Sequence, residues 1–242
     1  MNILVIGESC KDVFKYGECD RLDPAAPAIV FKPLETKENG GMAMNVYRNL
    51  TSLSATTDII TNQNWSIITK TRFVDKKTNY ILLREDNNDN QYGKINLNLI
   101  NFEKYQAIII SDYDKGFLSK KDIQNICRKH PLVFLDTKKE IGKWCECVQF
   151  IKINNYEYNK SKNISITLKD KLVVTLGPLG AMHKEKIYPV KAVDIKDLSG
   201  AGDTFISGLV YKFIESRDIE KAIQFANECA TVVVQKSGVS VV

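Results

Sequence analysis

The stretch "DLSGAGDTFISGLVYKF", residues 197–213, places an acidic residue at the start of an apolar helix. After Asp203, apolar residues recur on one helical face, at positions 205, 206, 209, 210, 213 and 214. Three small residues precede the acid: Gly200, Ala201 and Gly202. Small residues leave the first backbone N–H groups of a helix uncovered, and these groups with the helix dipole form an anion site.

An acid in this position has two interpretations. In the first, Ser199 or Asp203 is a helix N-cap and the glycines form a turn. In the second, Asp203 is a general base beside a phosphate-binding loop and accepts the proton of a hydroxyl during phosphoryl transfer. The rest of the chain has to decide between them.

The elements around this stretch alternate between strands and helices. Short apolar runs predict strands at 3–7, 107–111, 132–136, 149–153 and 171–177. Helical patterns cover 42–53, 119–129, 201–216 and 219–236. This order predicts a three-layer α/β/α sandwich with a mostly parallel central sheet.

Two segments interrupt the alternation, at about 13–33 and 70–85. Apolar and polar residues alternate there, as in half-exposed antiparallel strands. We interpret them as a small β lid on the main sheet. Because no linker or repeat separates them, residues 1–242 are predicted to form a single domain.

Composition narrows the functional classes. No run of eighteen apolar residues and no signal peptide is apparent, so we expect a cytoplasmic protein without a membrane partner. The six cysteines include no C-x-x-C motif, which favours reduced structural thiols. The net charge of +5 is spread along the chain, which disfavours a nucleic-acid partner and remains compatible with small phosphorylated ligands.

Polar residues follow most of the predicted strands. Singly, each is explained by a turn or a cap, but loops after parallel strands converge on one edge of a sheet, where ligands bind. Their joint occurrence therefore favours a site. The residues are Asp12, Gly40, Gly41, Asn45, Asp112, Lys115, Lys138, Asn154, Glu157, Thr175, Gly177 and Gly180.

These motifs, in this order, resemble the ribokinase-like, or PfkB, family of carbohydrate kinases. "DLSGAGD" resembles its C-terminal signature and "GGMAMNV" its N-terminal Gly-Gly signature. "SDYDKG", "LDTKK", "KINNYE" and "FANECATVVVQKSGVS" are similar to segments of the heptose-7-phosphate kinases, so the resemblance covers nearly the whole chain. It implies ATP-dependent phosphorylation of a sugar or sugar phosphate, with Mg²⁺.

The resemblance also implies roles for individual residues. Asp203 matches the catalytic base, and residues 200–202 match the loop whose amides stabilise the transferring phosphoryl group. The expected sugar-site residues are Asp12, Gly40, Gly41, Asn45 and Asp112, with Lys138 and Lys115 facing a phosphate. The expected nucleotide-site residues are Asn154, Thr175, Gly177, Gly180 and Asn227, with Glu157 organising Mg²⁺ through water.

The lid segments carry two further candidates, Arg72 and Arg84. Each could bind a sugar phosphate through paired N–H groups, and each could equally be a solvated charge on an edge strand. By resemblance, the lid covers the sugar and pairs two copies into a homodimer.

The chain also departs from the family pattern. The segment after residue 53 is short, which predicts that one covering helix is missing, and Leu198 stands where the signature has Thr. Two alternatives to a heptose-phosphate kinase therefore stay open: a kinase for another sugar or a nucleoside, and a non-catalytic sugar-phosphate-binding homologue. A dinucleotide-binding domain is disfavoured because "TLGPLG" lacks the glycine spacing of that fingerprint.

Overall fold

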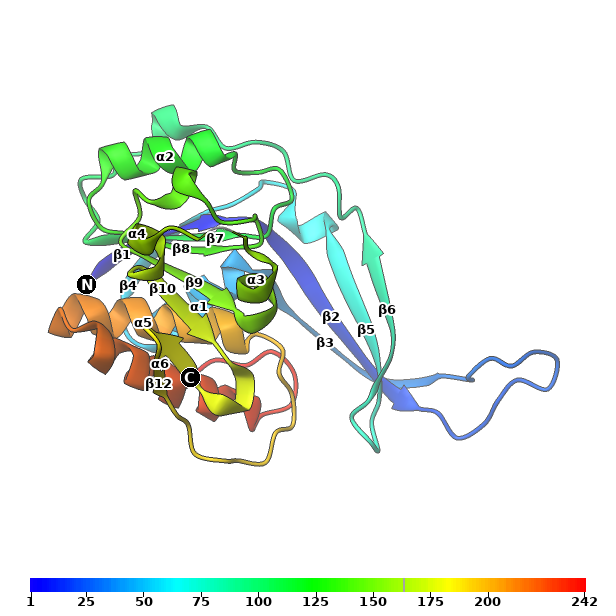
Figure 1. Ribbon diagram of the computed structural model, residues 1–242. Coiled ribbons are helices and arrows are strands. Elements are labelled where there is room, and N and C mark those ends of the chain that lie inside the picture. The colour runs from blue at the N-terminus through cyan, green and yellow to red at the C-terminus, as the bar shows by residue number, and fades with distance from the viewer. Residues whose placement is uncertain (163) are drawn as a thin grey trace.

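The computed structural model describes residues 1–162 and 164–242 and contains a large sheet between two helical layers (Figure 1). The strand order is β12-β11-β10-β9-β8-β7-β1-β4, and the six strands from β10 to β4 are parallel. The strands are β1 (Asn2–Gly7), β4 (Thr56–Ile60), β7 (Ala107–Asp112), β8 (Val133–Thr137), β9 (Phe150–Asn154), β10 (Leu172–Thr175), β11 (Ala181–His183) and β12 (Lys186–Tyr188). The predicted α/β sandwich is confirmed.

The helices divide between the two faces of the sheet (Figure 1). One face carries α1 (Ala43–Ser52), α5 (Ala201–Ser216) and α6 (Ile219–Val234). The other carries α2 (Lys120–Lys129) and the short helices α3 (Asn155–Lys160) and α4 (Ile166–Lys169). Single 3₁₀ turns are η1 (Trp65–Ile67), η2 (Leu97–Leu99), η3 (Lys143–Cys145) and η4 (Gly177–Leu179). No helix in the described residues is long and apolar enough to cross a bilayer.

Local sequence explains these boundaries. The central strands are apolar on both faces, and Ile108, Ile109 and Ile110 of β7 are fully buried. Helix α2 begins after Ser119, which forms a reciprocal capping box with Asp122. Helix α5 begins after Gly200, whose φ of 81° lies in the left-handed region that glycine adopts without strain.

A second sheet of order β3-β2-β5-β6 forms the lid, which projects to one side (Figure 1). Its strands are β2 (Ser9–Glu18), β3 (Lys32–Met42), β5 (Thr69–Asp75) and β6 (Ile81–Asn87). The lid sheet thus extends beyond the expected 13–33 and 70–85. Gly40 and Gly41 end strand β3 and precede α1, because β2 pairs with β3 up to Met42.

Contacts join the lid to the C-terminal part of the chain. Phe14, Tyr16 and Val74 form a small apolar cluster in the lid, and Val239 packs against it. At the tip of the β5–β6 hairpin, Asn79 donates a hydrogen bond from Nδ2 to the backbone oxygen of Lys196, at 2.7 Å. The lid therefore lies over the segment that leads into α5.

The layers are thin in two places. Residues 53–69 contain β4 and η1 and no α-helix, as the short segment predicts. In the described part of the crossover from β9 to β10, the helices are α3 and α4, of six and four residues. β4 is consequently a partly exposed edge strand.

Candidate active site

The Asp203 carboxylate lies in the first turn of α5 and is 6% exposed. The Nδ2 of Asn45, on α1, donates to its Oδ2 at 3.0 Å. The hydroxyl of Tyr113, in the loop after β7, donates to its Oδ1 at 2.8 Å. The carboxylate is therefore held from two sides by neutral donors, and either of its oxygens can still accept a proton.

The environment of Asp203 suits a general base. Burial raises its pKa to about 6, opposed by the Asn45 and Tyr113 hydrogen bonds and reinforced by the charge of Asp136. A carboxylate with this pKa is mostly ionised at neutral pH and binds a proton more readily than an exposed aspartate does. Of the two interpretations of the sequence, the general base is the one that this geometry favours.

A buried glutamate positions Tyr113. Glu8, after β1, is fully buried and accepts hydrogen bonds from the backbone N–H groups of Tyr113, at 2.9 Å, and Lys115, at 3.1 Å. Burial, together with the charge of Asp112, raises the pKa of Glu8. The sequence analysis missed both Glu8 and Tyr113, because their partners become adjacent only when the sheet forms.

Replacing Tyr113 by Phe removes a hydrogen bond that stabilises ionised Asp203. We expect the pKa of Asp203 to rise above about 6, and the acid limb of the kcat/KM profile to move to higher pH by about half a unit to one unit. The value of kcat/KM near pH 6 should fall by about two- to fivefold and recover at higher pH. Tyr158→Phe, on α3, is the matched control with an unchanged profile. A Tyr113→Phe profile that moves to lower pH would contradict this assignment.

A polar cavity of about 350 Å³ opens between the lid and Asp203. Ser199 and Gly200 form part of its wall, with Met42, Tyr113 and Val239. Its charged lining residues are Asp12, Lys70, Arg72, Arg84, Lys115, Lys138 and Asp203. Five cations against two acids make this cavity suitable for an anionic ligand.

Asp12 and Gly41 form one corner of this cavity. Asp12, on β2, is 7% exposed, and its Oδ1 accepts a hydrogen bond from Arg72 Nη1, on β5, at 2.6 Å. Gly41 lies against it, since a Cβ there would come within 2.2 Å of Asp12 Oδ2. The structure thus brings Asp12, Gly41 and Arg72 together: Asp12 and Arg72 line the cavity, Gly41 lies behind Asp12, and the Arg72 guanidinium is bound to Asp12.

Two lysines of the cavity, Lys70 and Lys115, are anchored by Asp89, a residue that the sequence analysis did not single out. Asp89 accepts hydrogen bonds from Lys70 Nζ, at 2.7 Å, from Tyr92 Oη, at 2.7 Å, and from Lys115 Nζ. Arg84 is bound by Asp86, and its side chain is 46% exposed. The sequence analysis also missed Lys70 as a site residue, because nothing in the alternating lid segment distinguishes it from an exposed lysine.

A second cavity, of about 250 Å³ and largely apolar, lies on the other side of the α5 N-terminus. Four predicted nucleotide-site residues line it: Thr175, Gly177, Gly180 and Asn227. Ala201 and Gly202 contribute to its wall, as does Leu198. The first turn of α5 therefore separates two cavities, with Gly200 and Asp203 facing the polar one.

Six predicted residues line neither cavity: Gly41, which lies behind Asp12; Glu157; and the four described next. Asp112 is buried and bound by Thr137 Oγ1 and by Lys139 Nζ, at 2.6 Å, which indicates a structural role. The amide of Asn45 is bound to Asp203, and Asn154 caps α3 by accepting from the N–H of Glu157, at 2.8 Å. Gly40 lies in β3 against Met44, outside the cavity lining.

Glu157 is the described residue that best fits a water-mediated role at a magnesium ion. One of its oxygens accepts from the backbone N–H of Asn154, at 2.8 Å, and the other from Lys138 Nζ. No cluster of three or more metal-binding side chains occurs among the described residues. This donor set fits Mg²⁺ held mainly by nucleotide phosphates and waters.

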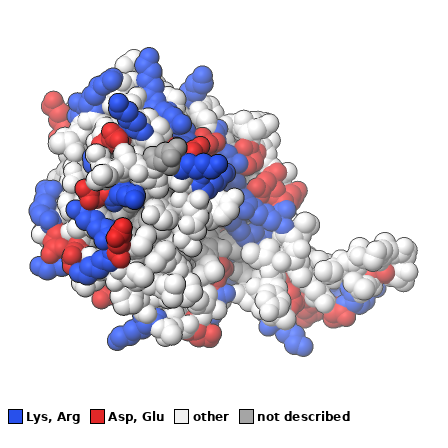
Figure 2. Space-filling model, viewed as in Figure 1, with Lys and Arg blue, Asp and Glu red and all other residues white. Residues whose placement is uncertain are grey.

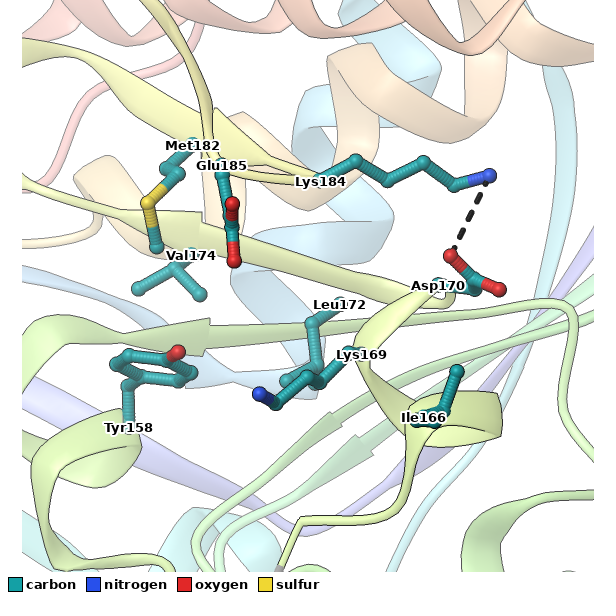
Figure 3. Close-up of a pocket in the computed structure, with 9 residues that line it drawn as sticks. All are labelled: Tyr158, Ile166, Lys169, Asp170, Leu172, Val174, Met182, Lys184 and Glu185. Atoms are coloured by element: carbon teal, nitrogen blue, oxygen red, sulfur yellow. Dashed lines mark ion pairs between the residues drawn. The ribbon is translucent and has the colours of Figure 1, made fainter.

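A further cavity of about 230 Å³ lies on the thinly covered face of β10 and β11 (Figure 3). Leu172, Val174 and Met182 form its floor, and Lys184 pairs with Asp170 at its rim, at 3.5 Å. None of the predicted site residues lines this cavity.

Figure 2 shows basic and acidic side chains mixed across the core and the lid.

Comparison with solved structures defines the class. The chain is similar to a nucleoside kinase of Methanocaldococcus jannaschii described as an archaeal member of the ribokinase family, with a TM-score of 0.72, 17% identity, and 98% and 93% of the two chains covered. It is also similar to an Arabidopsis thaliana ribokinase complexed with ribose and ATP, with a TM-score of 0.70, 12% identity, and 98% and 93% covered. The protein therefore has the ribokinase fold.

Sequence comparison gives the family. Residues 59–241 match the pfkB family carbohydrate kinases, and the chain belongs to this family. It is 32% identical to the bifunctional protein HldE of Aliarcobacter butzleri and 29% identical to that of Helicobacter pylori, each over 98% of this chain. The chain spans about three fifths of the length of these relatives, at 61% and 63%.

The comparison also explains the thin layers. The alignment with the A. butzleri protein extends over 293 positions and this chain has 242 residues, so at least 51 aligned positions have no counterpart here. The missing helix after residue 53 and the short α3 and α4 are consistent with internal shortening.

Proposed function

We propose that this carbohydrate kinase transfers the γ-phosphoryl group of ATP to a hydroxyl of a sugar phosphate. The most specific version is phosphorylation of heptose 7-phosphate at its anomeric hydroxyl, giving heptose 1,7-bisphosphate and ADP. The observation that carries the proposal is the position of the α5 N-terminus between a basic cavity and a largely apolar one. A phosphoryl acceptor and a nucleotide bound on the two sides would meet at its uncovered N–H groups.

The residues divide the chemistry between them. Asp203 takes the proton of the attacking hydroxyl as the new O–P bond forms and the bond to the ADP oxygen breaks. The backbone N–H groups of residues 200–202 stabilise charge on the transferring group. Mg²⁺, when bound, neutralises phosphate charge, and Glu157 would orient its waters. Lys138 is bound to Glu157 and also lines the polar cavity, so it lies between the proposed Mg²⁺ site and the proposed sugar site.

The acceptor's own phosphate is proposed from the charge of the cavity. Lys70, Lys115 and Arg84 reach it from the lid and from the loop after β7. These cations already pair with Asp86 and Asp89, but each keeps N–H groups that a phosphate could bind, whereas a free sugar or a nucleoside offers no anion to them. The charge of the cavity therefore favours a sugar phosphate. The resemblance to heptose-7-phosphate kinases supports the heptose.

The proposal is tested by ATP consumption with heptose 7-phosphate, hexose phosphates, free sugars and nucleosides. We expect turnover that is highest on heptose 7-phosphate and is lost when EDTA removes Mg²⁺. Highest turnover on a free sugar or a nucleoside would refute the sugar-phosphate assignment. If no compound consumes ATP and a sugar phosphate raises the melting temperature, the protein is a binding homologue, and the shortened layers and Leu198 become the features to examine.

We also propose that two copies pair through the lid. Four large apolar side chains are more than half exposed on its strands and hairpin tip: Leu34 at 54%, Tyr80 at 73%, Ile81 at 51% and Leu83 at 59%. Ile81 and Leu83 lie on β6 on either side of an irregularity in its pairing with β5. We expect a dimer by sedimentation, with Leu83→Glu weakening it at least tenfold. Ile166→Glu, which places the same charge at an exposed apolar side chain of α4, should leave the dimer as stable as in the wild-type protein. A monomeric wild-type protein would refute the pairing.

A further inference from the structure

A lysine and an aspartate form a buried ion pair beneath the first turn of α5. Lys152 on β9 and Asp136 on β8 are cross-strand partners, with Nζ and Oδ2 2.8 Å apart. Their side chains are 5% and 6% exposed. Buried charges of this kind seldom add net stability relative to apolar residues of the same volume, so the pair calls for another explanation.

The lysine reaches the helix that carries the base. A Cβ placed on Gly202 would lie 2.8 Å from Lys152 Nζ, so the ammonium group fills the space that glycine leaves open one residue before Asp203. The pair also acts on Asp203 electrostatically. The negative charge of Asp136 raises the pKa of Asp203, and the positive charge of Lys152 lowers it.

We propose that the Lys152–Asp136 pair is a positioning element for the base: Lys152 supports the first turn of α5, and Asp136 offsets the lysine's charge so that the ammonium group does not change the proton binding of Asp203. This inference rests on the proposed role of Asp203 as the base. Lys152 lies against the helix, both residues act electrostatically on Asp203, and neither needs to contact the sugar.

Other groups also face Asp203 and have to stay constant in a test. Tyr113, in the loop after β7, donates to it, and Asn45, on α1, is neutral. Lys138, after β8, interacts with the charge of Asp203, and Asp12, on β2, faces Tyr113 across the cavity. Variants at 136 and 152 leave all four in place, so a change in Asp203 ionisation can be assigned to the pair.

The experiment measures Asp203 directly, by ¹³C NMR of the side-chain carboxyl carbons in protein labelled with [¹³C]aspartate. The signal that is present in the wild-type spectrum and absent from that of Asp203→Asn is assigned to Asp203. The Asp136 variants additionally lose the signal of Asp136. In the wild-type protein its midpoint should lie near pH 6. Asp136→Asn removes the repulsion and leaves Lys152 charged, so the midpoint should fall by about one pH unit. Asp136→Asn/Lys152→Met removes both charges and should return it toward the wild-type value.

A second pair, remote from the site, provides the control. Lys104 and Asp58 form another Lys–Asp pair, at 2.9 Å, and neither residue lines the cavity that contains Asp203. Lys104→Met/Asp58→Asn should leave the Asp203 midpoint unchanged. If Asp136→Asn does not fold, Asp136→Ser removes the same charge.

The outcomes separate the inference from the proposed function. A midpoint that stays fixed in Asp136→Asn, or that the double variant fails to restore, overturns the inference even if the protein is an active kinase. Turnover that survives Asp203→Asn would instead refute the role of Asp203, whatever the NMR titrations show. A fall in the single variant and recovery in the double variant support the positioning role.

Discussion

Replacing Asp203 by Asn is expected to lower kcat by about a thousandfold or more while the KM values for ATP and sugar phosphate change little. The amide cannot accept the hydroxyl proton, whereas its size and position match those of the carboxylate. Steady-state kinetics together with ligand-induced shifts of the melting temperature measure both effects. A variant that keeps more than a tenth of wild-type turnover would exclude Asp203 as the base.

The same substitution should stabilise the protein at neutral pH. Because burial raises the pKa of Asp203 from 3.8 to about 6, the folded state binds this proton more tightly than the unfolded state does. The group therefore favours folding in acid, and its contribution is lost as pH rises from about 4 to about 6. At pH 7 the ionised carboxylate therefore costs the folded state on the order of 3 kcal/mol. The expected net gain from Asp203→Asn is about 1–2 kcal/mol, because the amide has one hydrogen-bond acceptor fewer than the carboxylate.

The pH dependence of the stability gained by Asp203→Asn tests whether the gain comes from the raised pKa of Asp203. The difference in stability between Asp203→Asn and the wild-type protein, measured by thermal unfolding, should be largest at pH 7 and level off below pH 3.8, where Asp203 is mostly protonated in both states of the wild-type protein. A variant that is less stable than wild type at pH 7 would show that the carboxylate contributes net stability through Asn45 and Tyr113.

Replacing Gly41 by Ala is expected to raise the KM for the sugar phosphate by about a hundredfold, with little effect on the KM for ATP. The added Cβ would meet Asp12 Oδ2 at 2.2 Å and Cys10 Sγ at 3.2 Å. Asp12 has to move, and its 2.6 Å contact with Arg72 is disturbed. The apolar cavity has no residue in common with this corner, so nucleotide binding should persist.

Gly142→Ala is the matched control. The nearest atom to a Cβ on Gly142 belongs to Trp144, at 3.7 Å, and its φ of −178° suits any residue. Kinetic constants for both substrates should stay within about twofold of the wild-type values. If both glycine variants raise the sugar KM equally, the effect reflects general destabilisation and the role of the Asp12 corner is wrong.

The sequence predicted the frame of this protein more completely than the contacts of its site. Continuous apolar runs identify strands such as β7, because a strand buried on both faces has no other composition available. Helix α5 was predicted at 201–216, where the structure places it, from its periodicity and the preceding small residues. The lid ranges were predicted too short, since β2 pairs with β3 as far as Ser9 and Met42.

The contacts of the site depend on residues far apart in the chain. Asn45 and Asp203 are separated by 158 positions, and Tyr113 and Asp203 by 90. Motif spacing predicted Asp203 as the base, and nothing in it indicated that Asn45 binds Asp203. A signal for Lys152 did exist: a lysine inside the otherwise apolar run at 149–153, where a charge is expensive unless it has a partner.

The pairing of the lid has a consequence for the order in which the protein folds. Strands β2 and β5 run parallel, with Asp12 opposite Lys70, so the two lid hairpins join only after a loop of more than fifty residues closes. Pairings between residues so distant in the chain form slowly. The corner that holds Asp12 and Arg72 is therefore expected to assemble after the main sheet. In native-state hydrogen exchange, the amides of β5 should open at lower free energy than those of β7. The part of the molecule that selects the sugar would then be the last to fold and the first to open.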